Sequence, residues 1–253
     1  MWPYPRTLAH RGGGTLAPEN TIAALRCGLA HGYRAVEFDV MLAKDGVPVV
    51  VHDVELGRTV AGSGSIPDYT AGQLAAMEAG AWFGPEFAGE GVPAFDAVLA
   101  YCQANGIWMN IEIKPAPGFE QQTGEVVARA TRGHIAAGGS LPLLSSFSIE
   151  ALEAAREAAP ELARGWLVEA LPPDWLVQAR ALGVVAMHCD HTPLTREQVQ
   201  LVKQEGFGVF CYTVNTPQRA SELFAWGVDG FCTDRIDLIK AMEQVGLAGQ
   251  GPA

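Results

Sequence analysis

Basic residues are scarce in this chain of 253 residues. Lysine and arginine together number 17, against 28 aspartates and glutamates, so the net charge at pH 7 is −11. An acidic surface repels nucleic acids and anionic membranes, which argues against both as partners. Small molecules and other proteins remain as ligands. An anionic small molecule would need locally placed cations, so the positions of the few basic residues matter more than their number.

Long apolar runs and paired cysteines are also missing. No stretch is long and apolar enough to span a bilayer, and the first residues lack the basic start and apolar core of a signal peptide. The five cysteines form no CxxC pair, so we expect buried, reduced thiols rather than disulfides or a zinc site. These absences predict a cytoplasmic protein without stable membrane association. The oligomeric state stays open, with a homodimer as one option.

A regular alternation of short apolar runs and amphipathic segments fills most of the chain. The runs typical of β-strands are residues 7–11, 35–40, 108–114, 142–147, 164–168, 183–189, 208–214 and 227–233. Helical patterns separate most of them, and several end in glycine, as helices often do. Strand and helix repeated in this way predict a (β/α)8 TIM barrel, with an open doubly wound sheet as the structural alternative.

One interval departs from this alternation. After "VPVVVHD", residues 54–92 lead to a helix expected near Ala94, and this distance is too long for an ordinary barrel loop. We expect a small inserted subdomain after the second strand of a single barrel domain that covers residues 1–253. Because loops that follow barrel strands lie at the active-site face, the insertion should overhang the site. Residues 246–253 indicate a loose tail.

Charged residues recur at the ends of the first three predicted strands. They are His10 and Arg11 on the first, Glu37 and Asp39 on the second, and Glu112 and Lys114 on the third. Residues two apart on a strand point to the same side, so the three carboxylates should meet at one mouth of the barrel. Their repulsion becomes coordination if a divalent cation lies between them, and oxygen ligands suit Mg²⁺ or Ca²⁺. Alternatively, each carboxylate is solvated or ion-paired.

Arg11 and Lys114 have two interpretations. They are salt-bridge partners of these carboxylates, or they hold a phosphate beside the metal. Two histidines, His10 and His52, lie near the same mouth. A single histidine at a strand end is commonly structural, but cleavage of a phosphate ester needs one group that takes a proton and another that gives one. Imidazole titrates near neutral pH, so the sequence predicts an acid–base pair.

Other polar residues carry weaker signals. His134 is predicted to lie in a glycine-rich turn with a structural role. His188 and His191, at the sixth predicted strand, stay open between structure and substrate contact. Asn20 or Thr21 can cap the first helix, and contact of Asn20 with the site is the alternative.

Five stretches resemble, in the same order, the motifs of the glycerophosphodiester phosphodiesterases. They are "AHRGGGTLAPENT", "VEFDVMLAKDGVPVVVHD", "NIEIK", "YTVN" and "GVDGFCTD". The resemblance covers nearly the whole chain. It implies a (β/α)8 barrel with a small insertion after strand two, a divalent metal, and hydrolysis of glycerophosphodiesters to glycerol 3-phosphate and an alcohol.

The resemblance also implies roles for individual residues. Glu37, Asp39 and Glu112 would bind metal, His10 and His52 would be general acid and base, and Arg11 and Lys114 would meet the phosphate. Tyr212 departs from the tryptophan common in the family, which alters an apolar wall for the glycerol or the leaving alcohol. Arg235 and Ile236 stand where a proline is common.

Two rival functions are a phospholipase of related fold that acts on intact lipid and a catalytically silent barrel that binds a phosphodiester. The acidic charge and the lack of a basic amphipathic helix argue against the first. Both histidines beside all three carboxylates argue for turnover rather than binding alone, because binding does not require a proton-transfer pair.

Overall fold

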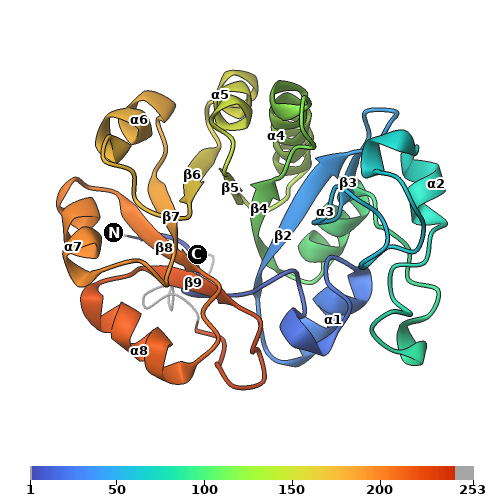
Figure 1. The fold of residues 1–253 in the computed structure, drawn as a ribbon, viewed down its shortest axis with the longest axis horizontal. Helices are drawn as coiled ribbons and strands as arrows, with labels where there is room; N and C mark the ends of the chain where they lie inside the picture. Colours follow the sequence, from blue (N-terminus) through green and yellow to red (C-terminus); the bar gives the residue numbers. More distant parts are fainter. Residues whose placement is uncertain (1, 243–253) are drawn as a thin grey trace, which may run out of the picture.

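Eight parallel strands close into a barrel in the computed structural model, which describes residues 2–242 (Figure 1). They are β1 (Thr7–Ala9), β2 (Ala35–Leu42), β4 (Trp108–Ile113), β5 (Leu143–Ser146), β6 (Ala163–Val168), β7 (Ala186–Asp190), β8 (Gly208–Tyr212) and β9 (Gly230–Thr233). The ring closes because β1 pairs with both β2 and β9, through Ala9 opposite Val36 and Thr7 opposite Phe231. The predicted TIM barrel is therefore confirmed, and the open sheet is wrong.

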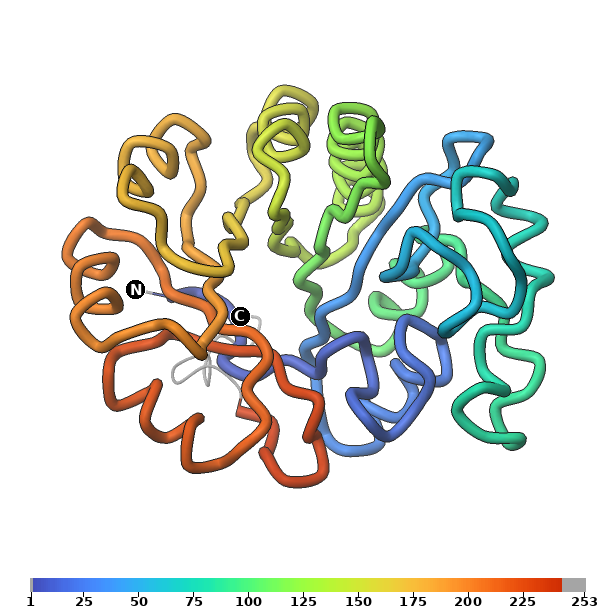
Figure 2. The backbone as a smooth tube through the Cα atoms, in the orientation of Figure 1, coloured from blue at the N-terminus to red at the C-terminus, as the bar shows by residue number. Residues whose placement is uncertain are grey.

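Seven helices form the outer ring that Figures 1 and 2 show around the strands. They are α1 (Ile22–Ala30), α3 (Phe95–Ala104), α4 (Glu120–Ala136), α5 (Ile149–Ala158), α6 (Trp175–Leu182), α7 (Arg196–Gln204) and α8 (Pro217–Trp226). Hydroxyl side chains cap several of them, as Thr195 and Thr216 do by accepting hydrogen bonds from the backbone of the first turn. Gly183 ends α6 with φ at +63°, a conformation that glycine adopts without steric cost.

His134 lies in the last turn of α4, so the glycine-rich turn predicted there is wrong. Gly133 does not end this helix, because packing of α4 against α5 outweighs the weak helix propensity of glycine. Gly124 allows α4 to lie close to α5, because a Cβ atom there would lie 2.2 Å from the carbonyl oxygen of Ala151.

The cysteines follow the sequence prediction closely. Cys102 on α3 and the strand residues Cys189, Cys211 and Cys232 are buried, Cys27 is half-buried, and all five are unpaired in the structure. Burial raises the pKa of Cys102 to about 12, so its thiol stays protonated at neutral pH. Among residues 2–242, none of the helices combines the length and apolar character needed to cross a bilayer.

The segment after β2 leaves the barrel and returns before α3. It begins with β3 (Pro48–Val50), which pairs antiparallel with the end of β2 and was not predicted as a strand. The insertion then contains η2 (Ile66–Asp68), α2 (Ala71–Ala75) and η3 (Pro85–Phe87), and it lies beside β2 and α1 in Figure 1. Buried apolar residues, among them Ile66 and Leu74, give it a small core of its own.

The insertion expected after the second barrel strand is thus present. Assignment of residues 1–253 to a single domain, with a subdomain at about 54–92, stays a prediction. The tail predicted at residues 246–253 lies outside the described residues.

Candidate active site

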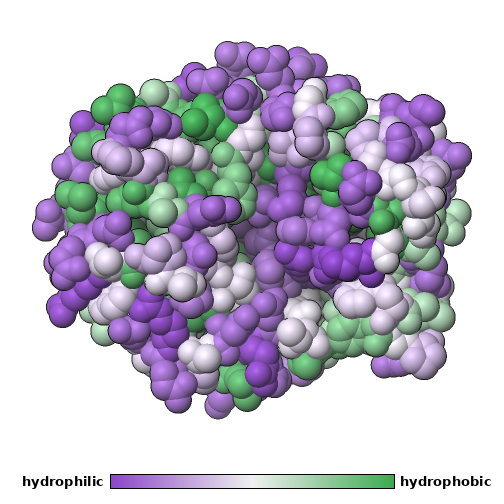
Figure 3. Space-filling view, viewed as in Figure 1, coloured by the Kyte–Doolittle hydropathy of each residue, from purple (hydrophilic) through white to green (hydrophobic). Residues whose placement is uncertain are grey.

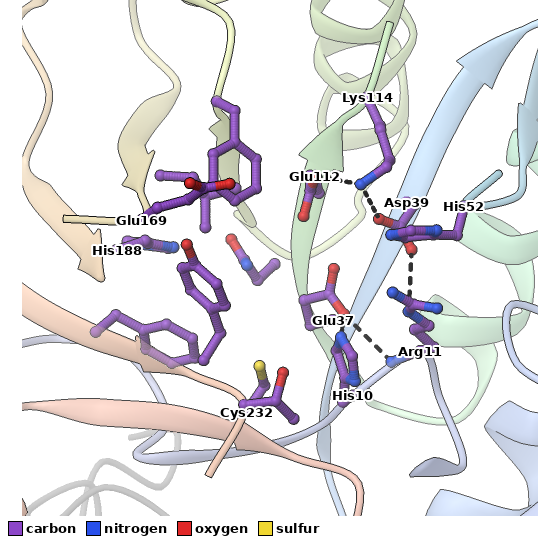
Figure 4. A pocket seen from close by; sticks show the side chains of 16 residues that line it. His10, Arg11, Glu37, Asp39, His52, Glu112, Lys114, Glu169, His188 and Cys232 are labelled. Carbon is purple, nitrogen blue, oxygen red and sulfur yellow. Dashed lines mark hydrogen bonds and ion pairs between the residues drawn. The ribbon is translucent and has the colours of Figure 1, made fainter. Parts of the chain in front are cut away.

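A pocket of about 400 Å³ opens at the C-terminal ends of the barrel strands. Polar side chains gather around the hollow at the centre of this face (Figure 3). The eight residues predicted to bind metal or substrate or to act in catalysis all line the pocket, namely His10, Arg11, Glu37, Asp39, His52, Glu112, Lys114 and Tyr212. The first seven form one wall, and Glu169 and His188 lie across from them (Figure 4).

Three buried carboxylates form the centre of the first wall. Glu37 and Asp39 come from β2 and Glu112 from β4, where it pairs in register with Asp39. One oxygen of each carboxylate lies within 4.8 Å of the other two. Burial, followed by repulsion from Asp39, raises the pKa of Glu37 well above its usual range and that of Glu112 to about 7. The three therefore resist full ionisation together, unless a cation compensates them.

Asp39 is the carboxylate that stays ionised. Burial opposes its charge, but Arg11, His52 and Lys114 together hold its pKa below the ordinary value. Arg11 Nε lies 3.6 Å from Asp39 Oδ2, and Lys114 Nζ lies 3.8 Å from Asp39 Oδ1. These separations are longer than good hydrogen bonds, so both cations soften the repulsion without saturating the oxygens. Three converging carboxylate oxygens fit a hard divalent cation such as Mg²⁺ or Ca²⁺.

Asn20 belongs to this site rather than to the helix cap. Its Nδ2 donates to Asp39 Oδ2 at 2.9 Å, whereas Thr21 caps α1 by accepting from the amide of Ala24 at 3.1 Å. Asn20 and Arg11 both have positive φ, at +59° and +50°. The backbone N–H of Asn20 donates to the backbone carbonyl of Arg11. Such backbone conformations are costly for residues other than glycine and often occur at functional sites.

The two histidines share one arrangement. His10 Nδ1 lies 2.6 Å from Asp234 Oδ1, and His52 Nδ1 lies 2.7 Å from Asp53 Oδ1. An ionised carboxylate only accepts, so each Nδ1 carries a proton, and Nε2 is left available for proton transfer. His10 Nε2 lies 3.7 Å from Glu37 Oε2, beside the carboxylate cluster. Each ring is therefore oriented by a carboxylate behind it.

Asp234 and Asp53 were not among the predicted site residues. Although burial opposes it, hydrogen bonds from Arg58 and His52 lower the pKa of Asp53 to about 2. The pKa of Asp234 is also lowered, because hydrogen bonds from His10 and Asn215 outweigh its burial. The sequence held a signal for both, since Asp53 follows His52 directly and Asp234 follows the last barrel strand.

Residues 10–238 match the sequence model of the glycerophosphoryl diester phosphodiesterase family. The chain belongs to this family. The resemblance drawn from the five motifs is thereby confirmed.

Relatives in the family cover nearly the whole chain. The protein named glycerophosphodiester phosphodiesterase from Caldanaerobacter subterraneus subsp. tengcongensis is 32% identical over 232 residues, which are 90% of this chain and 93% of that protein. A protein of the same name from Bacillus subtilis is 28% identical and is matched over 86% of its length by 94% of this chain. An Oleispira antarctica phosphodiesterase, solved in complex with the product sn-glycerol-3-phosphate, has a TM-score of 0.86 and 34% identity. The match covers 91% of this chain and 93% of that one.

The second wall of the pocket holds the family departure at Tyr212. Its hydroxyl donates to the carbonyl of Val168 at 3.0 Å, and its ring meets that of Phe147 edge-on at 5.7 Å. Leu167, Glu169 and His188 also line the pocket. In this member of the family, Phe147, Leu167 and the Tyr212 ring thus form an apolar part of the wall, with the Glu169 carboxylate beside it. Sequence reasoning missed Phe147, Leu167 and Glu169, although Phe147 and Glu169 directly follow strands.

The two histidines left open by the sequence have different positions. His188 lines the pocket, is 1% exposed, and neither ring nitrogen has a hydrogen-bond partner within residues 2–242. Burial lowers its pKa to about 3, so the ring is neutral. It fits because Gly165 stands beside it, where a Cβ atom would lie 2.3 Å from Nε2. His191 instead contacts Arg219 outside the pocket lining.

Proposed function

We propose that the protein hydrolyses glycerophosphodiesters to glycerol 3-phosphate and an alcohol, with a bound Mg²⁺ or Ca²⁺. The observation that carries this proposal is the convergence of three buried carboxylates, within 4.8 Å of one another, beside two carboxylate-backed histidines. The product complex of the Oleispira antarctica relative supports the same substrate class. Glu37, Asp39 and Glu112 would hold the cation, which supplies charge neutralisation and lowers the pKa of the attacking hydroxyl.

The remaining chemistry falls to the chain's own side chains. Arg11 and Lys114 bind the phosphate oxygens, which keeps the phosphorus next to the histidines. One of His10 and His52 takes the proton of the glycerol 2-hydroxyl as its oxygen attacks phosphorus, and the other protonates the departing alcohol. A cyclic phosphate results. In the second step water attacks phosphorus, the bond to the 2-oxygen breaks, and that oxygen regains a proton.

The neighbouring hydroxyl is the preferred nucleophile because the substrate already holds it near the phosphorus. Such proximity supplies roughly 7 kcal/mol or more of the barrier. The glycerol side is therefore specified, while the leaving alcohol meets the wall formed by Phe147, Leu167 and Tyr212.

We also propose a cytoplasmic location, which the five unpaired thiols support. A homodimer stays a prediction.

Release of glycerol 3-phosphate tests this function. With Mg²⁺ or Ca²⁺ present, the protein should release glycerol 3-phosphate from glycerophosphocholine, glycerophosphoethanolamine and glycerophosphoglycerol. A silent barrel would bind these diesters, measured by calorimetry, without releasing product. A phospholipase would cleave intact phospholipid in vesicles in preference to the deacylated diesters. Either outcome would contradict the proposal.

A substrate analogue without the glycerol 2-hydroxyl should bind but fail to turn over. The reason is that it keeps the phosphate contacts with Arg11 and Lys114 but lacks the internal nucleophile. Binding is measured by competition against glycerophosphocholine, and turnover by release of the alcohol. Brisk hydrolysis of the deoxy analogue would show that water attacks directly, which would remove the cyclic intermediate and leave the histidines their proton-transfer roles.

A further inference from the structure

Arg58, on the insertion, contacts two carboxylates at once. Its Nη1 and Nη2 donate to the two oxygens of Glu19 at 2.9 and 2.7 Å. Its Nη2 also donates to Asp53 Oδ1 at 3.0 Å, and its Nε donates to Asp53 Oδ2. The guanidinium therefore binds both oxygens of both carboxylates, a geometry that its planar fork suits.

Each of these carboxylates also contacts a side chain of the pocket. Glu19 Oε1 accepts from Arg11 Nη1 at 2.6 Å, and Asp53 Oδ1 pairs with His52 Nδ1 at 2.7 Å. Hydrogen bonds thus run without interruption from Arg11 through Glu19, Arg58 and Asp53 to His52. Arg11 and His52 lie together on the wall that carries the carboxylate cluster (Figure 4). The insertion is thereby linked to a phosphate ligand and to one of the two acid–base groups of the proposed reaction.

Arg58 is more exposed than the two carboxylates that it binds. The Glu19 and Asp53 side chains are only 14% and 24% exposed, whereas that of Arg58 is 49% exposed. Without Arg58, Asp53 would keep only its hydrogen bond with His52 and Glu19 only its contact with Arg11, so each carboxylate would be held from one side. A partly exposed ion pair contributes little to the free energy of unfolding. The same ion pair can still fix the positions of His52 and Arg11, and catalysis is sensitive to displacements of about 1 Å.

We propose that Arg58 is a positioning residue, which holds His52 and Arg11 in their reactive orientations through the carboxylates of Asp53 and Glu19. This inference rests on the proposed function. Arg58 itself lies outside the described lining of the pocket. The insertion accordingly has a role in turnover.

The first test compares Arg58→Met, Arg58→Lys and the control Arg180→Met. Arg180 is an exposed arginine in an ion pair of 2.7 Å with Glu205, remote from the pocket lining. Arg58→Met should lower kcat by about tenfold to a hundredfold, the usual scale for a residue that orients a ligand or base. Lysine has a single ammonium and cannot fork to both carboxylates, so Arg58→Lys should recover only part of the loss. Arg180→Met should keep the parental kcat, and melting temperatures should change little in all three.

A second test asks whether Arg58 acts through the two carboxylates. Addition of Arg58→Met to a Glu19→Gln, Asp53→Asn background should cause no further loss of kcat, because the links are already broken. A full additional loss there, or a parental kcat for Arg58→Met alone, would overturn the proposal.

A readout independent of activity separates this inference from the proposed function. In the parent protein, the Nδ1 proton of His52 should give a low-field NMR signal typical of an imidazole bonded to a carboxylate. Arg58→Met should broaden or shift it, whereas Arg180→Met should not. If the parent released no glycerol 3-phosphate but this signal changed, the proposed function would fail and the positional link would stand. An unchanged signal in Arg58→Met would contradict the link itself.

Discussion

Replacement of His10 or His52 by alanine should lower kcat by about a hundredfold or more, the usual scale for a lost general acid or base. Metal binding should persist in both variants, because neither ring is needed to hold the three carboxylates together. Each histidine is held by its own carboxylate, Asp234 or Asp53, so loss of one leaves the other in place. Steady-state kinetics measures the first effect and calorimetry with Mg²⁺ or Ca²⁺ measures the second.

The matched control is His31→Ala, at the exposed end of α1, which should keep the parental rate. A rate near that of the parent in either pocket variant would remove that histidine from the proposed pair. The parent should show a bell-shaped dependence of kcat/KM on pH, and each single variant should lose one limb. The two limbs belong to the pair rather than to either ring, because the rings share the same charged pocket.

Removal of the divalent cation by chelation should abolish activity, and addition of Mg²⁺ or Ca²⁺ should restore it. Glu37→Gln, Asp39→Asn and Glu112→Gln should each weaken metal binding measured by calorimetry, because each removes one anionic ligand. In the parent, a metal concentration of 100 times Kd should stabilise the fold by about 2.7 kcal/mol and raise the melting temperature accordingly.

The stability of the carboxylate variants without metal tests the repulsion among the three carboxylates. Three buried carboxylates repel one another, so neutralisation of Glu37 or Glu112 should leave the metal-free protein at least as stable as the metal-free parent. Glu125→Gln, on the exposed face of α4, should change neither metal affinity nor activity. Unchanged metal affinity in all three pocket variants would contradict the proposed ligand set.

Local sequence rules were sufficient for the carboxylate cluster and its strands. Glu37 and Asp39 could be placed on one face because strand side chains alternate, and Glu112 could be placed beside them because parallel strands end at one edge. The hairpin strand β3 escaped prediction because three residues show no periodicity. Helix α4 was not recognised because its last turn contains Gly133, whose weak helix propensity is overcome by packing against α5.

The contacts that orient the site could not be predicted, since they join distant segments. Arg58 lies 39 residues from Glu19, so no local pattern indicates that one arginine serves both Glu19 and Asp53. The burial of His188 could not be predicted either. Whether its ring fits inside the barrel depends on Gly165, a residue of the neighbouring strand. Alternation along β7 alone does not reveal that space.

Closure of the barrel between β1 and β9 also sets the order in which parts of the pocket can come together during synthesis. His10 is made near the start of the chain, but the carboxylate that orients it, Asp234, is made 224 residues later. A nascent chain that has completed β2 and β4 already contains all three carboxylates of the cluster. It still lacks the partner of His10, and its first strand has an unpaired edge. The ribosome must therefore release β9 and Asp234 before His10 can meet the carboxylate that orients it.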